Sequence, residues 1–95
     1  MDERPYAIGS EQWPGLAKMA EEAGELTQVV GKLIAAGGAD RHYDGSDLRR
    51  RLADECGDVL AAVRFFAEAN GLTEEVEARA AAKTDTFRRW HARRG

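Results

Sequence analysis

Residues 47–71, DLRRRLADECGDVLAAVRFFAEANG, carry the pattern that decides the fold class. Apolar residues recur through this stretch at steps of three and four, which is the period of an α-helix. Ser46 or Asp47 supplies an N-cap side chain, and the helix is expected to end near Asn70 with Gly71 in the C′ position. The expected core stripe consists of Leu48, Leu52, Cys56, Val59, Leu60, Val63, Phe66 and Ala67.

Two further helices are expected, one on each side of this stretch. The first runs from about residue 13 or 14 to about residue 36, where a Gly-Gly pair ends it. The third spans residues 73–90 with Thr73 as its N-cap, and its acidic first turn and basic last turn suit the helix dipole. The expected core stripe of the first helix consists of Leu16, Met19, Ala20, Ala23, Leu26, Val30 and Ile34.

The sequence predicts a single all-α domain over residues 1–95, in which residues 1–12 form an extended or irregular segment. No strand pattern, internal repeat or low-complexity tract is visible. Phe65 lies beside Phe66 but off the main stripe, so the second helix is apolar on more than one side. A helix of that kind is usually buried between partners. We therefore expect a bundle of three main helices per chain, completed by assembly into a homodimer or homotetramer.

Composition narrows the classes of function. The net charge of −3 argues against nucleic acid as the main partner, because a phosphate backbone requires a basic face. Cys56 is the single cysteine, and this count excludes an internal disulfide and fits a reducing compartment. Cys56 itself is expected to be a small core residue. No apolar run is long enough to span a membrane and no signal-peptide core is visible, so a cytoplasmic location is expected.

Two acidic pairs border the apolar stripes of the first two helices. Glu22 and Glu25 lie three residues apart, and Glu55 and Asp58 repeat that spacing. Residues three apart project from one side of a helix, so two antiparallel helices would bring the pairs face to face. Left alone, each like-charged pair at ~6 Å and an effective dielectric constant of ~20 costs roughly 3 kcal/mol.

A hard divalent cation with oxygen ligands is the natural neutralising group for such a cluster. The chain offers two histidines, His42 in a loop and His91 near the C-terminus, so Mg²⁺ or Mn²⁺ is favoured over zinc or di-iron. The ordinary alternative is a solvated acidic face. In that case Lys18 would pair with Glu22, and Arg51 with Glu55, as surface ion pairs.

Three motifs in order resemble the MazG-like nucleotide pyrophosphohydrolases, an all-α family. They are EEAGEL at residues 21–26, DECGDVL at residues 54–60, and KTDTFRRW at residues 83–90. The resemblance implies Mg²⁺-dependent hydrolysis of (deoxy)nucleoside triphosphates to the monophosphate and pyrophosphate. It also implies an oligomeric helical bundle, in agreement with the surplus apolar surface.

Individual roles follow from matching positions to the motifs. The resemblance implies that Glu21 orients or deprotonates the attacking water, and that the Mg²⁺ ligands are Glu22, Glu25, Glu55 and Asp58. Lys83 and Arg88 are expected to hold phosphate oxygens from the third helix. Trp13 is a candidate for stacking on a base, with a packing cap at the helix start as the alternative.

Two other functions compete with this interpretation. Phosphoribosyl-ATP pyrophosphohydrolase resembles the MazG-like proteins, but usually continues its second motif with a Tyr-His pair, where this chain has Val59-Leu60 after Asp58. A non-catalytic helical adaptor or oligomerisation module would keep its acidic face for solubility alone. The sequence leaves the preferred base, the sugar and the size of the oligomer open.

Overall fold

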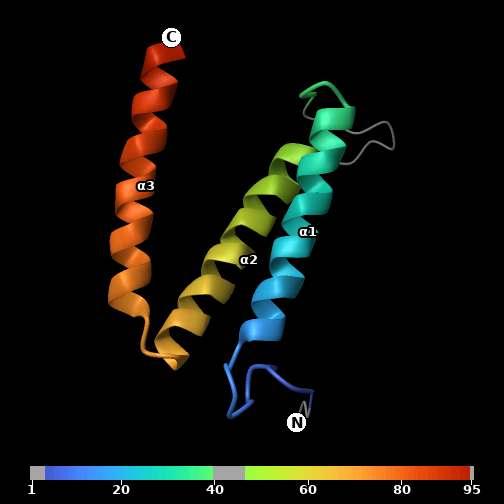
Figure 1. The fold of residues 1–95 in the computed structure, drawn as a ribbon. Coiled ribbons are helices and arrows are strands. Elements are labelled where there is room, and N and C mark those ends of the chain that lie inside the picture. The colour runs from blue at the N-terminus through green and yellow to red at the C-terminus, as the bar shows by residue number, and fades with distance from the viewer. Residues whose placement is uncertain (1–3, 40–46, 95) are drawn as a thin grey trace.

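The computed structural model describes residues 4–39 and 47–94, and over these ranges it consists of three α-helices with no strand. Helix α1 spans Leu16–Ala35, α2 spans Leu48–Ala69 and α3 spans Thr73–Arg94 (Figure 1). The predicted all-α architecture of three main helices is confirmed. None of the described helices is long and apolar enough to cross a membrane.

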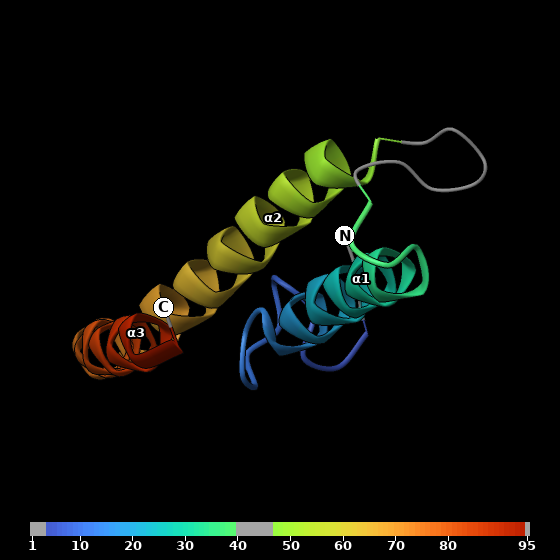
Figure 2. The same ribbon diagram turned by 90° about the horizontal axis from the view of Figure 1, so that it is seen from above.

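Helices α1 and α2 lie side by side and antiparallel, and their contact forms the core (Figures 1 and 2). Val29 on α1 and Leu48 on α2 are fully buried there. The predicted α1 stripe is wrong at four positions, because Ala20 and Ala23 are exposed and Val30 and Ile34 are 40% and 74% exposed. Neighbouring residues lie about 100° apart around a helix axis, so the apolar residues on α1 form two adjacent stripes, one containing Val29 and the other Val30. The one containing Val29 faces α2.

The ends of α2 follow the chemistry expected from the sequence. Asp47 is the N-cap, and its side chain accepts a hydrogen bond of 3.1 Å from the backbone N–H of Arg50. Gly71 has a φ of 69°, and the N–H of Leu72 donates to the carbonyl of Ala67 at 2.8 Å. This is the Schellman arrangement, which satisfies carbonyls at the end of a helix. Ser46, the alternative N-cap, lies outside the described residues.

Two members of the predicted α2 stripe do not lie in the core. Cys56 and Leu60 are exposed, although the sequence pattern assigns both to the buried face. Both lie on the side of α2 that carries Arg64. Arg64 pairs with Glu77 of α3, so this side is turned toward α3 instead of α1. Because α3 contacts α2 only near the turn that joins them, none of the three described helices covers this side further from that turn.

Residues 4–15 precede α1 without regular secondary structure and fold back on the start of that helix. The carbonyl of Tyr6 accepts from the N–H of Ala17 at 2.9 Å, and the carbonyl of Ala7 accepts from the N–H of Gly15 at 3.1 Å. These bonds satisfy amide groups that a helix start leaves free. The Asn70 side chain donates to the carbonyl of Pro14 at 3.0 Å, which ties the segment to the end of α2.

Helix α3 stands apart from α1, and the three helices do not close into a compact bundle (Figure 1). Arg64 and Glu77 form an ion pair of 3.5 Å between α2 and α3 near their shared turn. Phe87 and Trp90, further along α3, are 53% and 54% exposed. The radius of gyration is 16.2 Å, whereas a compact chain of this length has one of about 12.4 Å.

Candidate metal centre

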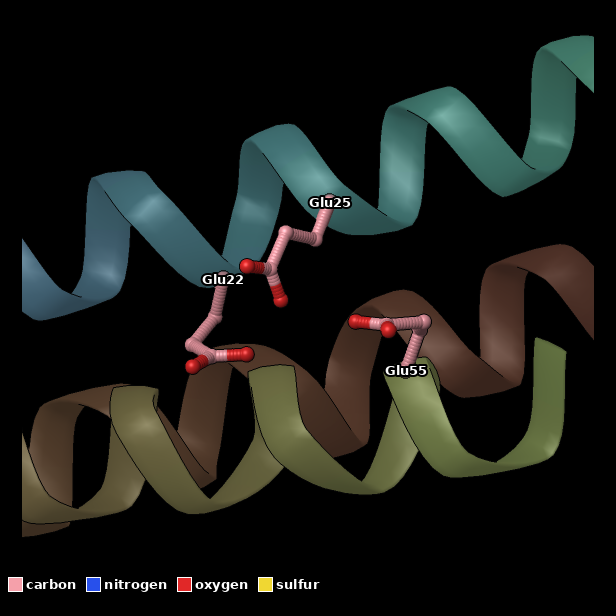
Figure 3. Close-up of side chains that lie close together, drawn as sticks. All are labelled: Glu22, Glu25 and Glu55. Atoms are coloured by element: carbon pink, nitrogen blue, oxygen red, sulfur yellow. The ribbon is translucent and has the colours of Figure 1, made fainter. Parts of the chain in front are cut away.

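Three glutamates meet in the space between α1 and α2. Glu22 and Glu25 project from α1, Glu55 projects from α2, and each offers a carboxylate oxygen within 4.8 Å of those of the others (Figure 3). The spacing of three residues places Glu22 and Glu25 on one side of α1. The antiparallel packing then brings Glu55 opposite them, so the predicted convergence of the two acidic motifs is present for these three residues.

The carboxylates of Glu22 and Glu55 are partly withdrawn from water. Glu22 keeps a side-chain exposure of 16%. One oxygen of each group, Oε2 in both cases, is buried without a hydrogen-bond partner among the described residues. Buried polar atoms almost always have a partner, so a water or an ion is the expected partner of these two oxygens. Both oxygens have the hard, anionic character that Mg²⁺ and Mn²⁺ prefer.

The electrostatic environment favours protonation of the same two groups. Burial raises the pKa of Glu22 above its ordinary value of 4.5, and the charges of Glu25 and Asp58 raise it further. Burial likewise raises the pKa of Glu55, again with contributions from Glu25 and Asp58. Lys18 and Arg51 act in the opposite direction, on Glu22 and Glu55 respectively, but do not reverse the result. The cluster therefore has more negative charge than its cationic neighbours offset.

Asp58, the fourth predicted ligand, lies beside the group of three instead of within it. Its charge acts on both Glu22 and Glu55. It also lines a hollow on the surface together with Glu22. The structure therefore shows three converging carboxylates with a fourth at their edge.

Glu21, the predicted water-orienting residue, forms an ion pair with Lys18. The distance from Lys18 Nζ to Glu21 Oε2 is 3.2 Å, and that to Glu22 Oε1 is 4.0 Å. Glu21 is not one of the three converging glutamates, and its side chain is half-exposed. The ordinary reading of Lys18 as an ion-pair partner of Glu22 is thus confirmed, and the same lysine holds Glu21.

The predicted phosphate-binding residues lie on α3, away from the acidic cluster of the same chain. Lys83 lines a shallow apolar hollow with Val76 and Ala80, while Arg88 is exposed. Since α3 makes no contact with α1, neither residue is brought to the glutamates within one chain. Their predicted role stays a prediction.

Trp13 has the packing contact that the sequence allowed as an alternative to base stacking. Its ring stacks on that of Phe66, with centroids 6.0 Å apart and planes 13° from parallel. Its φ of 48° is unusual for a residue other than glycine. Trp13 therefore packs on Phe66 while 52% of it is exposed, and contact with a base stays a prediction.

Sequence reasoning did not identify the hollow beside the acidic cluster. Its volume is about 370 Å³, and its lining consists of Ile8, Lys18, Glu22, Asp58, Ala61, Ala62 and Phe65. The one signal in the sequence was Phe65, an aromatic residue off the main stripe. Ile8 gave none, because the folding of the N-terminal segment onto the start of α1 depends on backbone hydrogen bonds that have no residue pattern.

No protein-family model, no curated protein and no solved structure matches this chain. The resemblance to MazG-like proteins rests on the three sequence motifs.

Proposed function

We propose that this chain is a divalent-metal-dependent nucleotide pyrophosphohydrolase, which cleaves a (deoxy)nucleoside triphosphate to the monophosphate and pyrophosphate. One observation carries the proposal: three carboxylates from the two acidic motifs converge between α1 and α2, and two of them have a buried oxygen without a partner in the described part of the chain. The motif resemblance supplies the reaction class. The alternative reading as an ordinary solvated acidic face does not account for the buried oxygens.

In this proposal Glu22, Glu25 and Glu55 hold Mg²⁺ or Mn²⁺, and Asp58, whose charge acts on Glu22 and Glu55, is the fourth ligand. The ion, when bound, supplies charge neutralisation for phosphate oxygens and lowers the pKa of a bound water. Phosphoryl transfer depends mainly on such positioning and charge stabilisation. Lys18 holds Glu21 beside the cluster, where that carboxylate can accept a proton from water.

We also propose that two copies of the chain associate through the apolar side of α3, formed by Val76, Ala80, Phe87 and Trp90. The chain exposes 7322 Å², whereas a compact monomer of this mass exposes about 5400 Å². A standard interface buries about 800 Å² on each partner. The excess surface is therefore ample for a stable dimer, and a dimer would offer a place for Lys83 to approach a partner's acidic cluster.

The reaction is tested by measuring pyrophosphate release from a panel of NTPs and dNTPs with Mg²⁺, with Glu55→Gln as the inactive control. Phosphoribosyl-ATP belongs in the same panel, because preferential hydrolysis of it would favour the competing histidine-synthesis activity. Release of orthophosphate alone would refute cleavage between the α and β phosphates. A chain that hydrolyses none of these compounds and gains no thermal stability from Mg²⁺ or Mn²⁺ would fit the non-catalytic module instead.

A further inference from the structure

The hollow beside the acidic cluster has two chemically different ends. Glu22 and Asp58 form one end, and Glu22 is also a member of the converging group. Phe65, Ala61 and Ala62 from α2 form the other end together with Ile8, and Lys18 from α1 completes the lining. The volume of about 370 Å³ lies within the range of about 300–1,000 Å³ for small-molecule sites. A ligand that fills it would have an apolar, flat part joined to a part that meets the carboxylates.

Phe65 is held in place at this hollow although 41% of it remains exposed. A Cβ at Gly15 would lie 3.0 Å from Cδ1 of Phe65, so this glycine lets the backbone turn lie directly against the ring. Gly15 has a φ of 85°, which favours glycine for a second reason. An aromatic ring fixed on one side and open on the other is a platform for stacking.

We propose that this hollow binds the nucleoside part of the substrate, with the base stacked on Phe65; this rests on the proposed hydrolase function. Lys18, the one cation in the lining, is paired with Glu21 and Glu22, so the two carboxylates at the polar end would repel a triphosphate unless a divalent cation were bound. Nucleotide binding therefore requires the metal. With the metal present, the phosphates lie at the glutamates and the base extends toward Phe65 and Ile8.

The same lining sets the specificity. Apart from Lys18, which is paired with Glu21 and Glu22, the side chains beyond the carboxylates have no hydrogen-bonding group with which to read the edge of a base: they are Ile8, Ala61, Ala62 and Phe65. Stacking tolerates every base, because each offers a π-face. A hydrophobic pocket also discriminates weakly between ligands of similar shape. We therefore expect kcat/KM to differ by less than about tenfold among the four bases.

The experiment compares ligands with and without a nucleoside. Calorimetry with Mg²⁺ measures binding of an α,β-methylene nucleoside triphosphate and of inorganic tripolyphosphate, and steady-state assays of pyrophosphate release give kcat and KM. Phe65→Leu removes the stacking ring and Ala61→Leu fills the hollow from an exposed helix position. Ile34→Ala, which removes an exposed apolar side chain far from the hollow, is the control.

Phe65→Leu and Ala61→Leu are expected to weaken nucleotide binding and raise KM by roughly fivefold or more, since stacking on one aromatic ring contributes that much. Tripolyphosphate affinity and kcat should change less than about twofold, and Ile34→Ala should change nothing. Equal weakening for both ligands, or an unchanged KM in an active enzyme, would overturn the assignment of the hollow. Nucleotide binding that depends on Phe65 without any pyrophosphate release would instead refute the hydrolase function and leave the hollow as a nucleotide site. If the unsubstituted protein neither binds the nucleotide nor releases pyrophosphate, both proposals are refuted.

Discussion

At the scale of single residues, the central feature is the pair of carboxylates at Glu22 and Glu55. Each lies three residues from the second acid of its motif and beside the apolar stripe, which is why their convergence could be predicted from spacing and antiparallel packing. Their burial could not be predicted, because it depends on how closely α1 and α2 approach. The unpartnered oxygens of both groups follow from that approach.

Neutralising one member of the cluster should stabilise the metal-free protein and abolish its response to metal. In Glu55→Gln the repulsion from Glu25 and Asp58 is removed, so the Tm in EDTA should rise. In the unsubstituted protein, Mg²⁺ at 100 times its Kd should stabilise the fold by about 2.7 kcal/mol. Differential scanning fluorimetry measures both, with Glu68→Gln on the exposed side of α2 as control. An equal response to Mg²⁺ in Glu55→Gln and the control would contradict a metal site here.

The raised pKa values of Glu22 and Glu55 predict how metal-free stability depends on pH. Both folded pKa values exceed the ordinary value of 4.5, so the folded state binds protons more tightly than the unfolded chain. Stability from these groups therefore falls as pH rises through the folded pKa values, and is regained as pH falls toward 4.5. The Tm advantage of the double variant Glu22→Gln/Glu55→Gln should shrink from about pH 7 down to about pH 4.5. A constant advantage over that range would contradict the raised pKa values.

At the scale of elements, the helices were predictable where their ends carry their own signals. Asp47 and Gly71 cap α2 through bonds that the residue types themselves provide. The start of α1 was predicted two or three residues early, because Gly15 has a left-handed conformation that stops the helix there. Val30 and Ile34 were assigned to the core because α1 carries two adjacent apolar stripes. Only the packing against α2 decides between them.

Gly15 should be the least tolerant glycine of the N-terminal segment. Gly15→Ala combines a positive φ with a contact of 3.0 Å to Phe65, and should lower the free energy of unfolding by about 1–3 kcal/mol. Gly9→Ala is the matched control, since a Cβ there meets nothing within 4 Å. Urea denaturation measures both variants. Similar stabilities for the two would show that the turn does not hold the Phe65 ring as described.

At the scale of the whole molecule, α1 and α2 form a thin core and α3 extends away from it. Assembly was predicted from apolar residues that outnumber the places in one small core, and the exposed surface of 7322 Å² supports the same proposal. The geometry of that assembly could not be predicted. It depends on where α3 points, and the periodicity of a helix contains no information about its direction.

A charge on the apolar side of α3 should disrupt self-association. Phe87→Glu places a carboxylate among Val76, Ala80 and Trp90, and should raise the dimer Kd at least about tenfold, since one buried unpaired charge costs several kcal/mol. Ala78→Glu is the control, because nine residues correspond to about two and a half turns and place it on the opposite side of α3. Sedimentation velocity measures the association. A monomeric wild-type chain, or equal dimerisation of both variants, would contradict the proposed interface.

The turn at Gly71 also determines the length of the molecule. Residues 70–72 lie outside the helical path, and among them Gly71 has the left-handed φ of 69°, a conformation that an alanine adopts reluctantly. If Gly71→Ala let α2 continue into α3, residues 48–94 would form one rod of about 70 Å at 1.5 Å per residue, against a present longest extent of 43 Å. The conformation of this turn therefore decides whether α2 and α3 are two helices or one continuous helix. Small-angle scattering would distinguish the two by their maximum dimension.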